Sequence, residues 1–172
     1  GNVDITVDGC TFTATGDAVN EAVALQIKAS KNAKALNCTA TDLHSLVQAQ
    51  SCDETVVVNE CTINGKNGVA FKQVKAATVE GTTITALEYG IRVDGNTDNY
   101  GIVVKNNNVT ANQTFIVRKM TGANNTITLE GTNTLTTEAE YQIVITNGSD
   151  DEEYVKPTGT YSLTVLSRKD ST

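Results

Sequence analysis

The chain has 172 residues, of which 39% are hydrophobic and 19% are charged. This length and composition suit one domain with a packed core and argue against a wholly disordered chain. Its 13 basic and 20 acidic side chains give a formal net charge of −7 at pH 7, which argues against nonspecific nucleic-acid binding because that needs clustered Lys and Arg. No apolar run reaches the roughly 18 residues of a membrane-spanning helix, and the first residues lack the pattern of a signal peptide.

The commonest residue types favour short strands joined by polar turns. The chain has 27 Thr, 19 Val and 17 Asn residues. Thr and Val favour the pleated, half-buried backbone of a strand, whereas Asn and Gly supply turns because they tolerate positive φ. Within this pattern, residues 17–25 (DAVNEAVAL) are predicted to form a turn or two of helix.

A pattern of apolar residues is repeated six times along the chain. It has the form apolar-x-apolar-x-x-anchor-x-apolar, in which the anchor is a small residue. The anchors, 21 to 28 residues apart, are Cys10, Cys38, Cys61, Thr82, Asn107 and Thr132. The second apolar position contains Val7, Ala35, Val58, Val79, Val104 and Leu129. Only Thr134, in the last unit, puts a polar side chain at an apolar position.

A second, shorter alternation lies between these units. Its apolar pairs are Leu25 and Ile27, Val47 and Ala49, Val69 and Phe71, Ile91 and Val93, Phe115 and Val117, and Ile143 and Ile145. Gly68 and Gly90 stand directly before two of these pairs. Leu163 and Val165 have the spacing of a seventh, partial unit.

The two patterns together predict a solenoid. Strict alternation puts every second side chain on one face of a strand, and the two x positions before each anchor imply a sharp corner. The corner residues are Asp8 and Gly9, Asn59 and Glu60, Glu80 and Gly81, Lys105 and Asn106, and Glu130 and Gly131. A repeat of this length holds about three short strands, and stacked repeats align equivalent side chains about 4.8 Å apart. We therefore predict one all-β domain over residues 1–172, with about six rungs in residues 3–146, followed by an acidic loop and a C-terminal strand or cap in residues 147–172.

The repeat units resemble those of a known family. VDGCTF, VNECTI, VEGTTI and VKNNNV, with GVAF and GIRV between them, resemble rungs of the single-stranded right-handed parallel β-helix of the pectate-lyase-like superfamily. In that family an Asn ladder often fills the inward corner position of Asn107, whereas Cys and Thr share the column here. The resemblance covers residues 3–146 and implies the fold. It implies no single activity, because the same coil carries lyases, hydrolases, epimerases, phage tailspikes and noncatalytic surface proteins.

The cysteines and the single histidine predict neither a metal site nor a cofactor. Cys10, Cys38 and Cys61 share one column, which indicates either a stack of small buried thiols or a disulfide between adjacent rungs. Cys52 lies near the end of the second strand and is expected to have no partner in the repeat. None has the C-x-x-C spacing of a zinc or redox motif. His44 is interpreted as a turn residue, since no Gly-x-Ser-x-Gly motif accompanies it.

A polysaccharide enzyme is the main alternative to a noncatalytic role. Residues 96–98 (NTD) resemble the first motif of the polygalacturonases, but residues 118–120 read RKM where that family has a pair of Asp residues. Glycoside hydrolysis needs two carboxylates at a controlled separation, and Asp98 alone stands in a family-like place. A lyase would instead use Arg92 or Arg118 as its base.

The outer side of the second strand corresponds to the active face of the family. One outward column is predicted to contain Gln26, Gln48, Ala70, Arg92, Ile116 and Val144, and the other Lys28, Gln50, Lys72, Asp94, Arg118 and Thr146. Asp94 is the single carboxylate of this basic, amide-rich face, whereas the Ca²⁺ site of a lyase needs six to eight oxygens. Gln amides and Arg guanidinium groups suit sugar hydroxyls and carboxylates. The candidate ligand-binding residues are Lys28, Gln48, Gln50, Lys72, Arg92, Asp94 and Arg118.

These observations favour a noncatalytic, secreted or cell-surface module that binds carbohydrate. The resemblance implies an extracytoplasmic, bacterial protein. The alternatives are a lyase or glycoside hydrolase acting on an acidic polysaccharide, and a structural spacer of a larger surface protein. Flanking domains of a longer chain are expected, because a core strand begins at Ile5 without a cap. Neither a nucleic-acid partner nor a transmembrane segment is expected.

Overall fold

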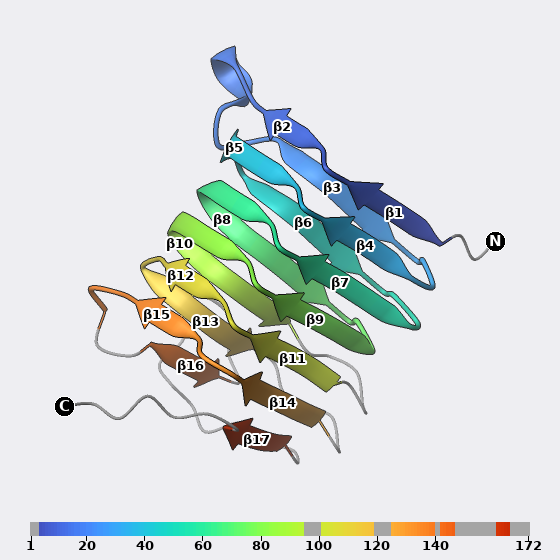
Figure 1. Ribbon diagram of the computed structural model, residues 1–172, viewed down its shortest axis with the longest axis vertical. Helices are drawn as coiled ribbons and strands as arrows, with labels where there is room; N and C mark the ends of the chain where they lie inside the picture. Colours follow the sequence, from blue (N-terminus) through green and yellow to red (C-terminus); the bar gives the residue numbers. More distant parts are fainter. Residues whose placement is uncertain (1–3, 95–100, 119–124, 140–141, 147–160, 166–172) are drawn as a thin grey trace.

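The chain coils into a parallel β-solenoid in which each turn lies against the next (Figure 1). The computed structural model describes residues 4–94, 101–118, 125–139, 142–146 and 161–165. The first sheet, called face 1, has seven parallel strands in the order β1 (Ile5–Asp8), β4 (Ala33–Leu36), β7 (Thr55–Asn59), β9 (Ala76–Glu80), β11 (Gly101–Lys105), β14 (Asn125–Glu130) and β17 (Tyr161–Val165).

The second sheet has ten strands and forms two further faces of the coil. Face 2 contains β2 (Thr11–Thr13), β5 (Thr39–Leu43), β8 (Thr62–Lys72), β10 (Thr83–Asp94), β12 (Asn108–Thr110) and β15 (Thr134–Thr136). Face 3 contains β3 (Val23–Lys28), β6 (Ser45–Gln50), β13 (Gln113–Arg118) and β16 (Ile143–Thr146), with the second halves of β8 and β10. The long strands β8 and β10 therefore pass from face 2 to face 3 without a break.

The strand register confirms the predicted repeat. On face 1, pairing aligns the second apolar positions of all six units, from Val7 on β1 to Leu129 on β14. β17 adds Leu163 and Val165 to the same columns, as predicted for a seventh unit. On face 3 the shorter apolar pairs are aligned in the same way. The prediction of an all-β parallel β-helix is confirmed.

The core is the set of inward columns. On β7, β9 and β11 buried residues alternate with half-buried ones. Val58, Val79 and Ile91 are fully buried, and burying a side chain of this size stabilises the fold by about 1.5 to 3 kcal/mol. At the N-terminal end Ile5 is 37% exposed, because among the described residues β1 has a neighbouring strand on one side only. Core burial is thus a property of stacked turns and not of a single turn.

The helix predicted for residues 17–25 is much shorter than expected. A 3-10 helix, η1, covers Gly16–Ala18, and β3 begins at Val23. β3 pairs with β6, so that Leu25 aligns with Val47 in the core. This tertiary pairing overrides the helix propensity of the local sequence. The acidic loop predicted near residues 147–153 lies outside the described residues.

A single left-handed residue makes each corner between face 1 and face 2. The φ angles lie between +51° and +63° at Gly9, Asn37, Glu60, Gly81, Asn106 and Gly131. Five of these residues are the second members of the predicted corner pairs. The same conformation recurs after face 3, at Ala29, Ser51 and Gln73. Asn and Gly are frequent at these corners because they adopt the left-handed conformation at the lowest steric cost.

The predicted anchors form an inward column, with one correction at its end. Backbone pairing aligns Val109 with Leu135, not with Thr134. The corner of the last unit therefore contains one extra residue, and Asn133, not Thr132, is its anchor. With this register the last apolar position is occupied by Leu135, and the exception that Thr134 made to the pattern disappears.

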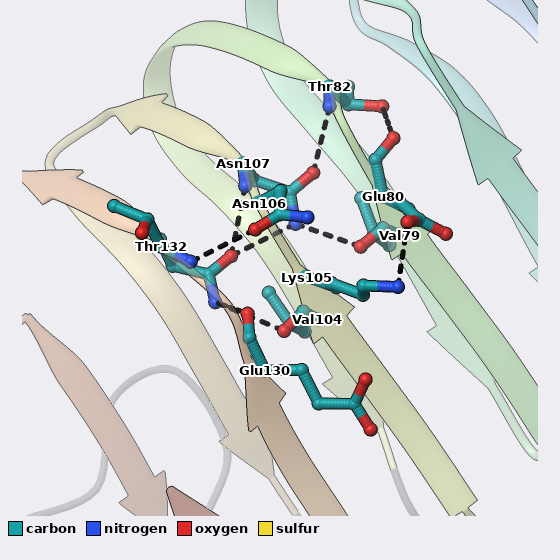
Figure 2. Close-up of polar contacts among 10 residues, drawn as sticks. Val79, Glu80, Thr82, Val104, Lys105, Asn106, Asn107, Glu130 and Thr132 are labelled. Carbon is teal, nitrogen blue, oxygen red and sulfur yellow. Dashed lines mark hydrogen bonds and ion pairs between the residues drawn. The ribbon is translucent and has the colours of Figure 1, made fainter. Parts of the chain in front are cut away.

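Side chains of the anchor column hydrogen-bond from one turn to the next (Figure 2). Asn107 Nδ2 donates to the Val79 carbonyl (2.8 Å), and Asn107 Oδ1 accepts from the Thr82 N–H (2.9 Å). Asn133 Nδ2 repeats the first contact one turn later, with the Val104 carbonyl (3.1 Å). Asn107 is 2% exposed, so these bonds satisfy backbone groups that water does not reach.

The cysteines occupy two inward columns. Cys38 and Cys61 are buried anchors and Cys10 is exposed, and all four cysteines are free thiols. Cys52, predicted to have no partner in the repeat, stands in a column with Ser30 and Val74, because each of the three follows the left-handed residue after face 3. The sequence pattern does not reveal this column, because its members share size and position but not chemistry.

Thiol labelling tests the burial of these columns. Burial raises the pKa of the Cys61 thiol to about 11, and the thiolate is the reactive form. With iodoacetamide at pH 8, the folded protein should therefore be alkylated at exposed Cys10, with Cys38, Cys52 and Cys61 modified only after unfolding. Mass spectrometry of native and urea-unfolded samples measures this, and rapid native labelling of Cys61 would contradict the column.

Candidate ligand-binding groove on face 3

A groove of about 310 Å³ lies on the outer side of face 3. Strand pairing aligns two outward columns beneath it, as predicted. One column contains Gln26, Gln48, Ala70 and Arg92, and the other Lys28, Gln50, Lys72 and Asp94; all eight residues line the groove. Six of the seven candidate ligand-binding residues are thereby brought together on one surface.

The predicted columns continue differently on β13 and β16. Arg118 pairs through its backbone with Asp94, and its side chain lies outside the described residues. Ile116 and Val144, predicted to point outward, are 4% and 5% exposed. These two residues are apolar and shielded from solvent, so Arg92 is the last polar residue of the first column.

One wall of the groove is not predicted by the alternating pattern of the strands. It is made by His44, Ser45, Asn67, Glu88 and Tyr89, which lie where the chain passes from face 2 to face 3. Backbone bonds stack this corner: the Asn67 N–H donates to the His44 carbonyl (2.7 Å), and Tyr89 pairs with Asn67 on the next strand. The position of Asn67 and Tyr89 directly before Gly68 and Gly90 was the available signal.

Both ring nitrogens of His44 lie within hydrogen-bonding distance of neighbouring side chains. Asn67 Oδ1 accepts the backbone N–H of Tyr89 (3.1 Å), so the Asn67 amide nitrogen faces His44 Nε2 (3.3 Å) and donates to it. In a neutral ring the proton then resides on Nδ1, which lies 3.2 Å from Ser45 Oγ. The Gln48 amide nitrogen is 3.0 Å from the same ring nitrogen. Because the oxygen and nitrogen of an amide are assigned from the hydrogen-bond network, a half-turn of this amide places its oxygen against the Nδ1 proton. The network therefore favours a neutral imidazole with a defined tautomer.

The pKa of His44 should be measurably low. Burial, followed by the nearby charge of Lys66, lowers the pKa of His44 from 6.5. In the unfolded chain the ring takes up its proton first as the pH falls, so the contribution of neutral His44 to stability is complete above pH 6.5 and is lost progressively below it. Because the chain contains one histidine, an NMR titration follows this ring alone.

A matched variant isolates the stability effect. The free energy of unfolding, measured in urea between pH 7 and pH 5, should fall more steeply for the native sequence than for His44→Gln. An NMR pKa at or above 6.5 would contradict the network.

Arg92 is fixed at the other end of the groove. Its Nε donates to Asp94 Oδ2 at 3.0 Å, and its guanidinium carbon lies 5.3 Å from the centroid of the Tyr89 ring. Both side chains of this ion pair are partly shielded, at 29% and 16% exposure. A planar guanidinium held by a carboxylate and an aromatic ring is preorganised for hydrogen bonding.

The described residues that line the groove include two carboxylates, and each is paired with a cation. Of its two carboxylates, Asp94 is paired with Arg92, and Glu88 lies 3.6 Å from the Lys66 ammonium. Asp98, the other candidate acid, lies outside the described residues. Within the described ranges, no group of three or more His, Cys, Asp or Glu side chains is placed to hold a metal ion. The same ranges include no helix with the length and hydrophobicity of a membrane span.

Comparison of the sequence with protein-family models and with curated proteins, and of the fold with solved structures, gives no match.

Proposed function

We propose that this chain is a noncatalytic binding module of a secreted or cell-surface protein, and that the groove on face 3 binds an acidic polysaccharide. The observation that carries the proposal is the gathering of cationic, amide and imidazole side chains, at regular strand spacing, in one groove bordered by the ring of Tyr89. The resemblance of the repeat units to the pectate-lyase-like superfamily supports an extracytoplasmic location.

The amides supply recognition of hydroxyl groups. Gln48, Gln50 and Asn67 each carry a carbonyl oxygen and an NH₂ group, so each both donates and accepts, as a sugar hydroxyl does. Gln26 continues the amide column on β3. Gln26 and Gln48 are aligned on adjacent strands, about 4.8 Å apart, and can contact neighbouring units of an extended chain that lies across the strands.

The cations supply recognition of carboxylates. Lys28 and Lys72 stand in one outward column with Gln50 between them, so their strands are about 10 Å apart. Both side chains are exposed. The formal net charge of the whole chain is −7, so most of the protein surface repels an anionic polysaccharide. These lysines provide a local site of attraction for it. Binding should weaken as salt screens these exposed charges.

The ion pairs of the two groove carboxylates, Asp94 and Glu88, support a noncatalytic role. Each is engaged with a cation, and a glycosidase needs one carboxyl group as a proton donor and another as a base or nucleophile. A lyase remains the alternative activity, with Arg92 as its base. Its Nε is already engaged by Asp94 Oδ2 at 3.0 Å, so this contact competes with a substrate for the guanidinium.

Isothermal titration with polygalacturonate and with a neutral glucan tests the proposal. Lys72→Glu should weaken binding of the acidic polymer about tenfold, which corresponds to about 1.4 kcal/mol. Lys34→Glu, the same charge reversal at an exposed position on face 1, is the matched control and should bind normally.

Two results would replace the proposal. Release of unsaturated uronate, followed by its ultraviolet absorbance and abolished by Arg92→Ala, would establish a lyase. Absence of binding to acidic and neutral glycans alike would favour a structural spacer.

A further inference from the structure

Face 2 carries a two-dimensional array of Thr side chains in which two positions are Asn. Each of its six strands has two outward positions, separated by one inward residue, and pairing keeps all of them in register. One outward column contains Thr11, Thr39, Thr62, Thr83, Asn108 and Thr134. The other contains Thr13, Thr41, Asn64, Thr85, Thr110 and Thr136.

The array is free of charge and open to solvent. Every side chain in the two columns is Thr or Asn, and all are exposed except half-buried Thr39 and Thr41. The outer sides of the other faces include charged residues, such as Lys34 on face 1 and Lys72 on face 3. Thr is a common residue on strands, and what sets face 2 apart from the other faces is that neither of its outward columns contains a charged side chain.

The positions of the array are regular in two directions. Neighbouring strands are about 4.8 Å apart, and two residues along a strand span about 6.6 Å. The two register irregularities of these strands fall after Thr41 and after Ala86, beyond the array. Thr is branched at Cβ and therefore has restricted χ1 freedom, so its methyl and hydroxyl groups are held in place before any ligand arrives. Figure 1 shows the strands of this face side by side and nearly parallel.

We propose that face 2 binds ice. The spacing between strands approaches the shorter spacing of water oxygens on a prism face of hexagonal ice, and the spacing of two residues along a strand is somewhat below the longer one. Hydroxyls near these positions can replace lattice waters while the methyls order the water between them. Charged groups would hold hydration shells that do not fit the lattice, and the array has none. Because the ligand is the flat surface of an ice crystal, binding does not require a groove.

The array suits this ligand better than a glycan surface. Flat carbohydrate surfaces are usually bound through aromatic rings that stack on the sugars, and neither column contains an aromatic residue. The proposal is independent of the groove, since face 2 and face 3 have different outward residues. Lys72→Glu should therefore leave ice binding unchanged.

Ice recrystallisation and thermal hysteresis, measured on the intact protein, test the proposal. The native protein should inhibit recrystallisation and facet ice crystals, and Thr83→Lys and Thr110→Lys should lose both effects. Thr78→Lys on β9 makes the same change on the outer side of face 1 and should retain them. Melting temperatures of all three variants confirm that each is folded.

Three outcomes would overturn the proposal. The first is that the native protein neither shapes ice crystals nor slows their recrystallisation. Alternatively, Thr78→Lys would lose activity as fully as the face 2 variants. Finally, sedimentation would show that face 2 joins two copies of the chain, with a dimer that Thr83→Lys dissociates.

Discussion

Gly90→Ala should destabilise the fold by about 3 kcal/mol, because a side chain there collides with two neighbours. A methyl group on Gly90 would lie 2.6 Å from the Thr114 carbonyl oxygen and closer still to the Val109 side chain. Gly68, one turn earlier, is equally confined by the Gly90 carbonyl and by Ile84. These glycines stand where β8 and β10 pass from face 2 to face 3, and fixed backbone on the next turn leaves little room for relaxation. The melting temperature should fall by about 10 °C.

Gly101→Ala is the matched control. Among the described residues, no atom lies within 4 Å of the position that its Cβ would occupy. The substitution removes conformational freedom from the unfolded chain and should be neutral or stabilising by up to about 1 kcal/mol. In urea unfolding, Gly90→Ala should therefore lower the free energy of unfolding, and Gly101→Ala should leave it unchanged or raise it. Equal stabilities would show that the seam between faces 2 and 3 is not tightly packed.

Asn107→Ala should cost about 3 kcal/mol, with a different physical cause. The truncation creates little strain but removes the side-chain acceptor of the Thr82 N–H and the side-chain donor to the Val79 carbonyl. Each unsatisfied buried group costs about 1 to 3 kcal/mol. Asn108→Ala removes the neighbouring, exposed amide and should change stability by less than about 0.5 kcal/mol. Denaturant melts of the two variants compare these costs directly.

Asn107→Thr tests the role of the ladder itself. Thr82 serves the same column one turn earlier, where its Oγ1 accepts from the Cys61 N–H and donates to the Glu80 carbonyl. A threonine at position 107 can therefore accept from the Thr82 N–H and should recover part of the loss. If the threonine variant were as unstable as the alanine variant, side-chain volume rather than hydrogen bonding would dominate the column.

The repeat was predictable because its two signals reinforce each other. Period-2 apolar positions define the faces, and corner pairs such as Glu80 and Gly81 define where the chain turns. The strands pair in the expected register from Val7 to Leu129, since a slip by one residue would expose every inward side chain. The same alternation predicted the outward columns as far as Arg92 and Asp94.

The residues that were not predicted lie at corners of the coil, where the number of residues varies from turn to turn. His44 and Asn67 lie 23 residues apart and meet only because the chain winds once between them. Asn133 was missed because one extra residue in its corner shifts it from the spacing of the other anchors. The wall of the groove is therefore a product of winding, which a local pattern does not encode.

The extra residue in the corner between Gly131 and Asn133 has a consequence for how this protein can change over evolution. It lengthens the loop but leaves the pairing of β14 with β11 and of β15 with β12 undisturbed. Insertions and deletions should therefore be tolerated at the vertices of the coil and rejected within its sides. Relatives would then differ in circumference from rung to rung while their stacking stayed constant.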